Sequence, residues 1–182
     1  MQRNDVLDQD ATSVVDTPIG RLAVTASPLG VRRVSRPRVP ARQRGAGSAE
    51  AAALLDRAVR ELGEYFAGDR TEFELPIDLS RVRPPHRAVL EHIRRELGYG
   101  QTTSYGAVAR ELQLPGAGAL AVGTAMARNP VLIMVPCHRV LGAGGALTGY
   151  SGGGVAVKRW LLDLENRRNL LPLDLPIAEL AG

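Results

Sequence analysis

The sequence predicts an α+β protein in which a small N-terminal α/β domain, with antiparallel strands and a helix, precedes a mostly helical domain containing a helix-turn-helix. Alternating apolar residues around a glycine turn indicate a hairpin near the start of the chain. Several later segments instead carry apolar residues at helical spacing. The stretch 81–85 ends in two prolines and reads as a linker, so a domain boundary is expected near residue 82.

The N-terminal domain is expected over residues 13–81, after a polar, disordered tail at 1–12. Ser48 is a candidate N-cap for its helix, and Gly68 is the expected stop. In chain order the pattern predicts strands at 14–16, 21–27 and 31–34, a loop at 36–47, a helix at 49–66 and a further strand at 73–79.

The C-terminal domain is expected over residues 82–168, followed by a peripheral tail at 169–182. Two short helices joined by the Pro/Gly turn at 115–118 form the helix-turn-helix candidate. The second of them is rich in small residues, which fits either tight helix packing or insertion into a nucleic-acid groove. The pattern predicts helices at 85–97, 105–112, 119–128 and 155–166, and a strand at 131–135.

Composition limits the class of protein. The 182 residues, 45% of them hydrophobic, suffice for a real core. A single cysteine excludes an internal disulfide and any zinc site built from several thiolates, and it suits a reducing cytoplasm. No apolar segment approaches the roughly 20 residues of a membrane span. We therefore expect a cytoplasmic protein without cofactor or metal. We also expect it to be a monomer. The net charge of +4 permits nucleic-acid binding without requiring it.

The one cysteine, Cys137, lies directly before His138. An imidazole can accept the thiol proton, and the thiolate is the reactive form of sulfur, so the pair can supply a nucleophile. An inert core cysteine is the other interpretation. An apolar run before Cys137 and a glycine-rich segment at 142–154 after it favour a position at the rim of a pocket. Glu165 fits either a surface charge or a buried partner for a histidine.

Four strings in the second half of the chain resemble the C-terminal domain of O6-alkylguanine-DNA alkyltransferases, also called methylated-DNA-protein-cysteine methyltransferases. The resemblance covers residues 84–168 and extends weakly, through 17–20 and 65–68, into the N-terminal domain, which would then be ribonuclease H-like. The strings are Asn129-Pro130, Val135-Pro136-Cys137-His138-Arg139-Val140, Gly149-Tyr150-Ser151-Gly152-Gly153 and Trp160-Leu161-Leu162-Asp163-Leu164-Glu165.

The resemblance implies a DNA repair enzyme that acts once. It transfers an alkyl group from O6-alkylguanine, or O4-alkylthymine, in double-stranded DNA to its own cysteine, after flipping the base from the minor-groove side. It implies that Cys137 is the acceptor, His138 a water-linked base, Glu165 the carboxylate orienting His138, and Asn129 a support for the neighbouring backbone. The residues implied at the substrate are Tyr105, Val140, Tyr150 and Ser151, and those implied at the DNA are Leu120, Ala121, Gly123, Thr124, Arg128 and Arg139.

One position departs from the family pattern. The family places an arginine on the recognition helix to fill the gap left by the flipped base, and this chain has Leu120 there. A leucine can wedge between bases but offers them no hydrogen bond. Arg128 is a candidate substitute. Two alternative functions follow, a lesion-binding DNA protein with weak or lost transfer and a cysteine alkyl acceptor for a substrate other than DNA.

Overall fold

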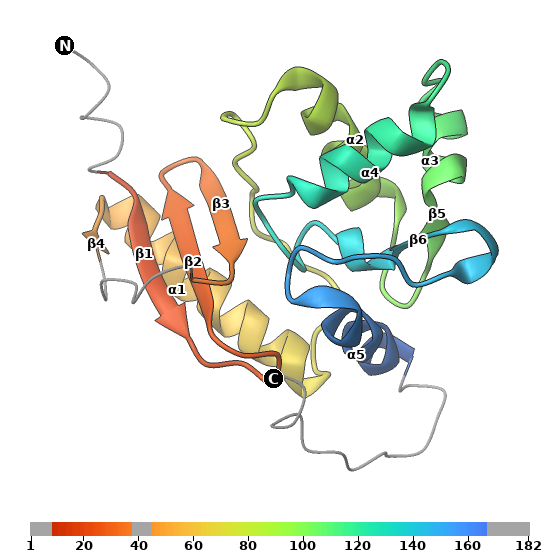
Figure 1. Cartoon of the computed structure of the whole chain (residues 1–182). Coiled ribbons are helices and arrows are strands. Elements are labelled where there is room, and N and C mark those ends of the chain that lie inside the picture. Colours follow the sequence, from red (N-terminus) through yellow and green to blue (C-terminus); the bar gives the residue numbers. More distant parts are fainter. Residues whose placement is uncertain (1–8, 38–44, 167–182) are drawn as a thin grey trace. The chain divides into compact units, whose positions relative to one another are not determined.

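The computed structural model describes residues 9–37 and 45–166 (Figure 1). Residues 1–8 and 169–182 of the two predicted tails, and most of the predicted loop at 36–47, lie outside the described residues. By its internal contacts the chain divides into two compact units, Met1–Arg81 and Val82–Gly182.

The first unit is built on an antiparallel sheet with the order β3-β2-β1-β4. Its strands are β1 (Ala11–Val15), β2 (Leu22–Ser27), β3 (Gly30–Ser35) and the short β4 (Gly45–Ala46). The predicted hairpin is confirmed as β2 and β3, and the strand predicted before it is confirmed as β1. Ala11 and Thr12, expected in the tail, pair with Ala46 and Gly45, expected in the loop. Both irregular segments were therefore predicted too long.

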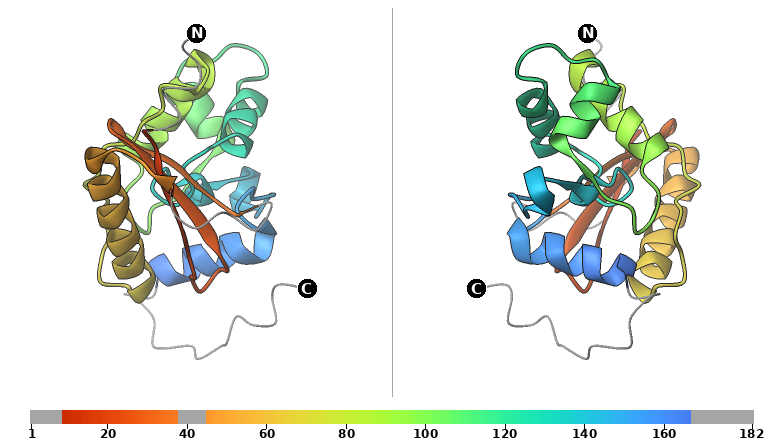
Figure 2. Two further views of the ribbon diagram at one scale, coloured as in Figure 1. Left: turned by 90° about the vertical axis from the view of Figure 1, so that its left-hand side faces the viewer. Right: turned by 90° about the vertical axis from the view of Figure 1, so that its right-hand side faces the viewer.

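Helix α1 (Ala49–Ala67) covers one face of this sheet, as two views of the ribbon show (Figures 1 and 2). Ser48 accepts a hydrogen bond from the backbone N–H of Ala51 at 3.2 Å, which satisfies one of the free donors of the first turn. Gly68 ends the helix with φ of 83°, a left-handed conformation that glycine adopts without strain. Leu55, Leu62 and Tyr65 are buried side chains of the helix itself. The predicted helix is confirmed at both ends.

The strand predicted at 73–79 is wrong, because only a single bridge forms there, between Val31 and Ile77. Val31 N–H donates to the Pro76 carbonyl at 2.8 Å, and Asp78 N–H donates to the Val31 carbonyl at 2.9 Å. Pro76 has no N–H, so it cannot contribute a donor to extend the pairing. The alternation of apolar residues in this segment reflects burial against the sheet edge.

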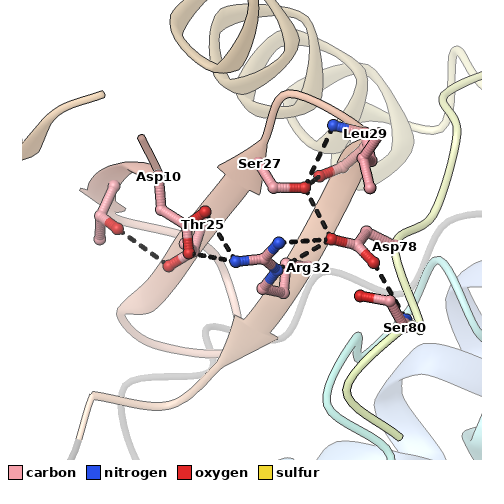
Figure 3. Close-up of polar contacts among 9 residues, drawn as sticks. Asp10, Thr25, Ser27, Leu29, Arg32, Asp78 and Ser80 are labelled. Atoms are coloured by element: carbon pink, nitrogen blue, oxygen red, sulfur yellow. Dashed lines mark hydrogen bonds and ion pairs between the residues drawn. The ribbon is translucent and has the colours of Figure 1, made fainter. Parts of the chain in front are cut away.

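A partly buried charge cluster joins β3 to two segments distant in sequence (Figure 3). Arg32 donates through Nη1 to both carboxylate oxygens of Asp10, at 2.6 and 2.7 Å, and through Nε and Nη2 to Oδ2 of Asp78, at 2.9 and 2.7 Å. Ser27 donates to the same Asp78 oxygen at 2.7 Å. Burial would raise the pKa of Asp78, but hydrogen bonds from Ser80, Ser27 and Arg32 outweigh it and hold that pKa well below its usual range.

The second unit is mostly helical, as predicted. Helix α3 (Tyr105–Glu111) is capped by the Ser104 side chain, which accepts from Ala107 N–H at 3.1 Å. Helices α3 and α4 (Gly118–Ala127) contact each other, and α2 (Pro84–Glu96) packs on α4. The elements are α2 (Pro84–Glu96), β5 (Thr103–Ser104), α3 (Tyr105–Glu111), α4 (Gly118–Ala127), the 3-10 turn η1 (Cys137–Arg139), β6 (Val140–Leu141), the 3-10 turn η2 (Ala143–Gly145) and α5 (Gly154–Asn166).

The strand predicted at 131–135 is a tight buried turn. Ile133 has φ of 72°, which is uncommon for a β-branched residue. Met134 N–H donates to the Leu132 carbonyl at 2.8 Å, and Val135 N–H donates to the Val131 carbonyl at 3.0 Å. Every residue from 131 to 140 is buried. A continuous apolar run has the same appearance in a buried strand and in a buried turn, so the sequence pattern could not separate them.

We predict that Arg32→Leu destabilises the protein by about 3 kcal/mol or more, because it leaves the buried carboxylate of Asp78 and the half-buried carboxylate of Asp10 without their cation. Urea unfolding of the full chain at pH 7, followed by circular dichroism, measures the change. Arg33→Leu is the matched control, since Arg33 is exposed on the same strand and the substitution removes the same charge. Equal losses in the two variants would contradict a stabilising role for the cluster.

Candidate functional site

Cys137 is the first residue of η1, and its side chain is buried. Asn129 holds it through a single amide group. The Nδ2 of Asn129 donates to the Cys137 sulfur at 3.1 Å and to the Val135 carbonyl at 2.9 Å. The Oδ1 of Asn129 accepts from Val131 N–H at 3.0 Å. One side chain thereby joins both ends of the buried turn to the thiol.

His138 and Glu165 form a pair whose side chains are both fully shielded from solvent. His138 Nε2 lies 2.7 Å from Oε1 of Glu165. A buried carboxylate acts as a hydrogen-bond acceptor, so Nε2 carries the proton and Nδ1 of the neutral ring has a free lone pair. Nδ1 is buried and has no hydrogen-bond partner among the described residues. Of the two interpretations of Glu165, the surface charge is wrong and the buried histidine partner is correct.

Arg139 does not fit the expected DNA contact, because it is buried and fully engaged within the unit. Its Nε and Nη2 donate to the two oxygens of Glu165 at 2.8 and 2.9 Å, and Nη1 donates to the Leu97 carbonyl at 2.7 Å. Gly100 N–H also donates to Glu165, at 3.2 Å. The planar guanidinium matches a carboxylate with two parallel bonds, which explains why arginine occupies this place.

Burial and charge set the protonation of the three central groups. Burial would raise the pKa of Glu165, but hydrogen bonds from His138 and Arg139 and the positive charge of Arg139 outweigh it and lower that pKa to about 2. Burial lowers the pKa of His138, although Glu165 opposes the shift, so the ring is neutral at neutral pH. Burial raises the pKa of Cys137 to about 11, with Asn129 and Lys158 opposing it. In the free protein the thiol is therefore protonated beside a neutral base.

The interpretation of the sequence missed Lys158, a fully buried residue of α5. Its Nζ donates to the Val140 carbonyl at 2.7 Å and lies 5.8 Å from the centroid of the Tyr105 ring. Its charge favours the thiolate of Cys137 and lowers the pKa of that thiol. A signal was present, because Lys158 is the only lysine of the chain and precedes Leu161 and Glu165 by three and seven positions, on one helical face.

The residues expected at the substrate are partly brought together. Tyr105 Oη lies 3.0 Å from Thr148 Oγ1, and Lys158 links the Tyr105 ring to the backbone of Val140. The ring of Tyr150 is buried, edge-on to His138 with 6.4 Å between centroids. A Cβ added at Gly152 would overlap the Tyr150 ring, so glycine is needed there. Ser151 is exposed in the turn before α5.

The small residues of α4 pack closely on its inner side, which is one of the two uses that the sequence left open. On its packed side, Val122, Ala125 and Met126 are buried, and a Cβ added at Gly118 would lie 3.0 Å from the side chains of Ala109 and Leu114. Gly123 lies beside Tyr105, 3.9 Å from its ring by the same measure. Three of the residues expected at the DNA are exposed here. Leu120 and Ala121 lie on α4, and Arg128 is its C-cap residue.

Other features of the described segments bear on possible ligands. A cavity of about 660 Å³ is lined by residues of α2, α3 and the loop between them, including the hydrogen-bonded side chains of His92 and Glu111, and not by Cys137 or His138. Within residues 9–37 and 45–166, no group of three or more His, Cys, Asp or Glu side chains could hold a metal ion. Nor does any helix in these ranges have the length and apolar character needed to cross a membrane.

Both units match known protein families. Residues 84–167 match the family model of the 6-O-methylguanine DNA methyltransferase DNA binding domain, and residues 12–79 match that of its ribonuclease-like domain. A methylated-DNA-protein-cysteine methyltransferase of Mycolicibacterium paratuberculosis is 43% identical over 88% of this chain and 95% of its own length. A DNA base-flipping protein of Thermus thermophilus is 42% identical over 82% and 95%. The crystal structure of Mycobacterium tuberculosis OGT in complex with DNA superposes with a TM-score of 0.75 at 38% identity, covering 91% of this chain and 98% of that one. The chain therefore belongs to the 6-O-methylguanine DNA methyltransferase family.

Proposed function

We propose that this protein repairs DNA by moving a methyl or larger alkyl group from O6 of guanine to its own cysteine, once per molecule and irreversibly. The observation that carries the proposal is the buried chain of groups from the Cys137 thiol, held by Asn129, to His138 and Glu165. These residues lie in the part of the chain that matches a methyltransferase DNA binding domain.

The geometry supports a direct displacement. His138 Nδ1 takes the thiol proton, through a water molecule, while Glu165 stabilises the imidazolium that forms. The thiolate attacks the alkyl carbon as the bond to O6 breaks, and the electron pair goes to guanine, which takes up one proton. Lys158 favours the thiolate, and the Tyr105 hydroxyl is the candidate donor to the leaving base. The reaction consumes no cofactor, and we propose none.

The substrate is double-stranded DNA. O6 of guanine lies inside the duplex, so the base must be flipped out for its alkyl group to reach Cys137. We assign the minor-groove contact to the exposed face of α4, with Leu120 and Ala121 at the bases, and Arg128 at a phosphate. Tyr150, Ser151 and the backbone of Val140 form the pocket for the flipped base. We further propose that the protein acts as a monomer in the cytoplasm, where a lone thiol stays reduced.

The two alternatives raised by Leu120 are not favoured. A lesion-binding protein without transfer has no need of a thiol that Asn129, His138 and Glu165 support together. A cysteine acceptor for a substrate other than DNA does not explain why residues 84–167 match a DNA binding domain. The relative from Thermus thermophilus is a DNA base-flipping protein. Base flipping is needed both for alkyl transfer and for lesion binding without transfer, so this relative does not separate the two functions.

We predict that incubation with a duplex containing O6-methylguanine adds one methyl group to the intact protein, located at Cys137 by peptide mass spectrometry. Cys137→Ala should abolish the mass shift, since it removes the nucleophile, and should still bind the duplex. An unmodified wild-type protein that folds and binds the lesion would refute transfer. Methylation of the Cys137→Ala variant would refute the choice of acceptor.

We predict that Glu165→Gln slows transfer by roughly a hundredfold, because His138 becomes a weaker base without the carboxylate. The carboxylate has a folded pKa of about 2, below its ordinary 4.5. Its contribution to stability is therefore present above pH 4.5 and is lost as the pH falls towards 2. The difference in unfolding free energy between wild type and variant should be about 3 kcal/mol at pH 7 and should shrink across that window.

Single-turnover kinetics and urea unfolding at several pH values measure these two effects. Asp163→Asn is the matched control, because Asp163 is exposed on the same helix and loses the same charge. It should change neither the transfer rate nor the pH dependence of stability. A stability difference between wild type and Glu165→Gln that stays constant from pH 7 to pH 3 would contradict the assignment of a depressed pKa.

A further inference from the structure

Leu120 is the most exposed large apolar side chain in the described part of the chain. Its exposed fraction is 72%, against 69% for Leu29 and 41% for Val155, the other two in this class. It lies in the first turn of α4 between Ala119 and Ala121, which are exposed and small. An exposed leucine is ordinary by itself. Its place on the outer face of a helix within the DNA binding domain gives it a specific use.

No other side chain on the exposed side of α4 has a proton free to donate to a base. Between Gly118 and Ala127 the helix contains no charged residue. Thr124, which has the one hydroxyl in that span, donates it to the Leu120 carbonyl at 2.9 Å. Arg128 is eight residues beyond Leu120, about 12 Å along the helix axis and out of reach of the same base step. Arg128 therefore cannot act in place of an arginine at position 120.

Extrusion of a nucleotide leaves a gap in the stack and an unpaired base on the other strand. An apolar side chain can hold such a gap open by its volume, as apolar wedges do in the minor groove. A hydrogen-bonding side chain in the gap would also distinguish one unpaired base from another, because a wrong partner leaves buried polar groups unsatisfied. Leucine supplies the volume without this discrimination.

We propose that Leu120 is a specificity-determining residue that fills the gap as an apolar wedge and makes repair indifferent to the base opposite the lesion. The inference rests on the proposed function, because it concerns the delivery of the same alkylated base to Cys137. The small residues around Leu120 let the helix backbone approach the groove, so that the whole side chain is available for insertion. The lesion is then accepted opposite thymine as readily as opposite cytosine, apart from the different cost of opening each pair.

The test compares single-turnover methylation of Cys137 by wild type, Leu120→Ala, Leu120→Met and Leu120→Arg. Substrates are O6-methylguanine in a single strand and in duplexes where it faces cytosine, thymine or an abasic site. Leu29→Ala is the matched control, since it truncates an equally exposed leucine in the other unit. Thermal unfolding of each variant should match wild type, because position 120 is exposed.

Leu120→Ala should slow transfer from duplexes by roughly tenfold or more while leaving the single-strand rate unchanged. The factor lost should be the same for every opposing base, because each ratio is taken on one duplex and only volume has been removed. Leu120→Met should retain the wild-type rate. Leu120→Arg should change the rate by a factor that depends on the opposing base, since arginine adds donors.

Equal slowing of single-strand and duplex transfer by Leu120→Ala would overturn the wedge. A loss factor that varied with the opposing base would overturn the indifference. Transfer from single strands by wild type stands independently of Leu120, so these outcomes leave the proposed function intact. Failure of wild type to methylate Cys137 on any substrate would remove the proposed function and this inference with it.

Discussion

The carboxylate of Glu165 is the group on which the second unit is organised. It accepts hydrogen bonds from His138, from Arg139 twice and from the backbone of Gly100. These contacts join helix α5, the turn that contains Cys137 and the loop after α2. A buried anion is stable only when several donors surround it. The contacts that fix His138, the residue after Cys137, are therefore also contacts that hold the unit together.

The chemistry follows from a balance between burial and proximity. Burial keeps the Cys137 thiol protonated in the free protein, which limits its oxidation and its reaction with stray electrophiles. In the proposed mechanism, a neutral His138 removes that proton because Glu165 stabilises the imidazolium that forms. The positive charge of Lys158, held by the Val140 carbonyl and the Tyr105 ring, also favours the thiolate of Cys137. In the proposed mechanism, the groups around the sulfur therefore activate it once a substrate is bound.

Helices were the part of the fold that the sequence predicted well, because caps such as Ser48, Ser104 and Gly68 act locally and leave a local signature. The strands predicted at 73–79 and 131–135 failed because an apolar run shows that a segment is buried, not how its backbone is paired. At the site, family motifs singled out Cys137, His138, Glu165 and Asn129, and the structure links them in two hydrogen-bonded pairs, Asn129 with Cys137 and His138 with Glu165. The buried state of Arg139 and Lys158 could not be read locally, since it depends on partners far away in the chain.

The burial of Lys158 has a practical consequence. It is the only lysine in the sequence, and its amine is enclosed and bonded to the Val140 carbonyl. Acyl donors and other amine-reactive reagents therefore find no accessible lysine side chain while the unit is folded. Acylation of this one amine requires α5 to lift from its neighbours, so the rate of labelling at Lys158 reports how often the folded domain opens.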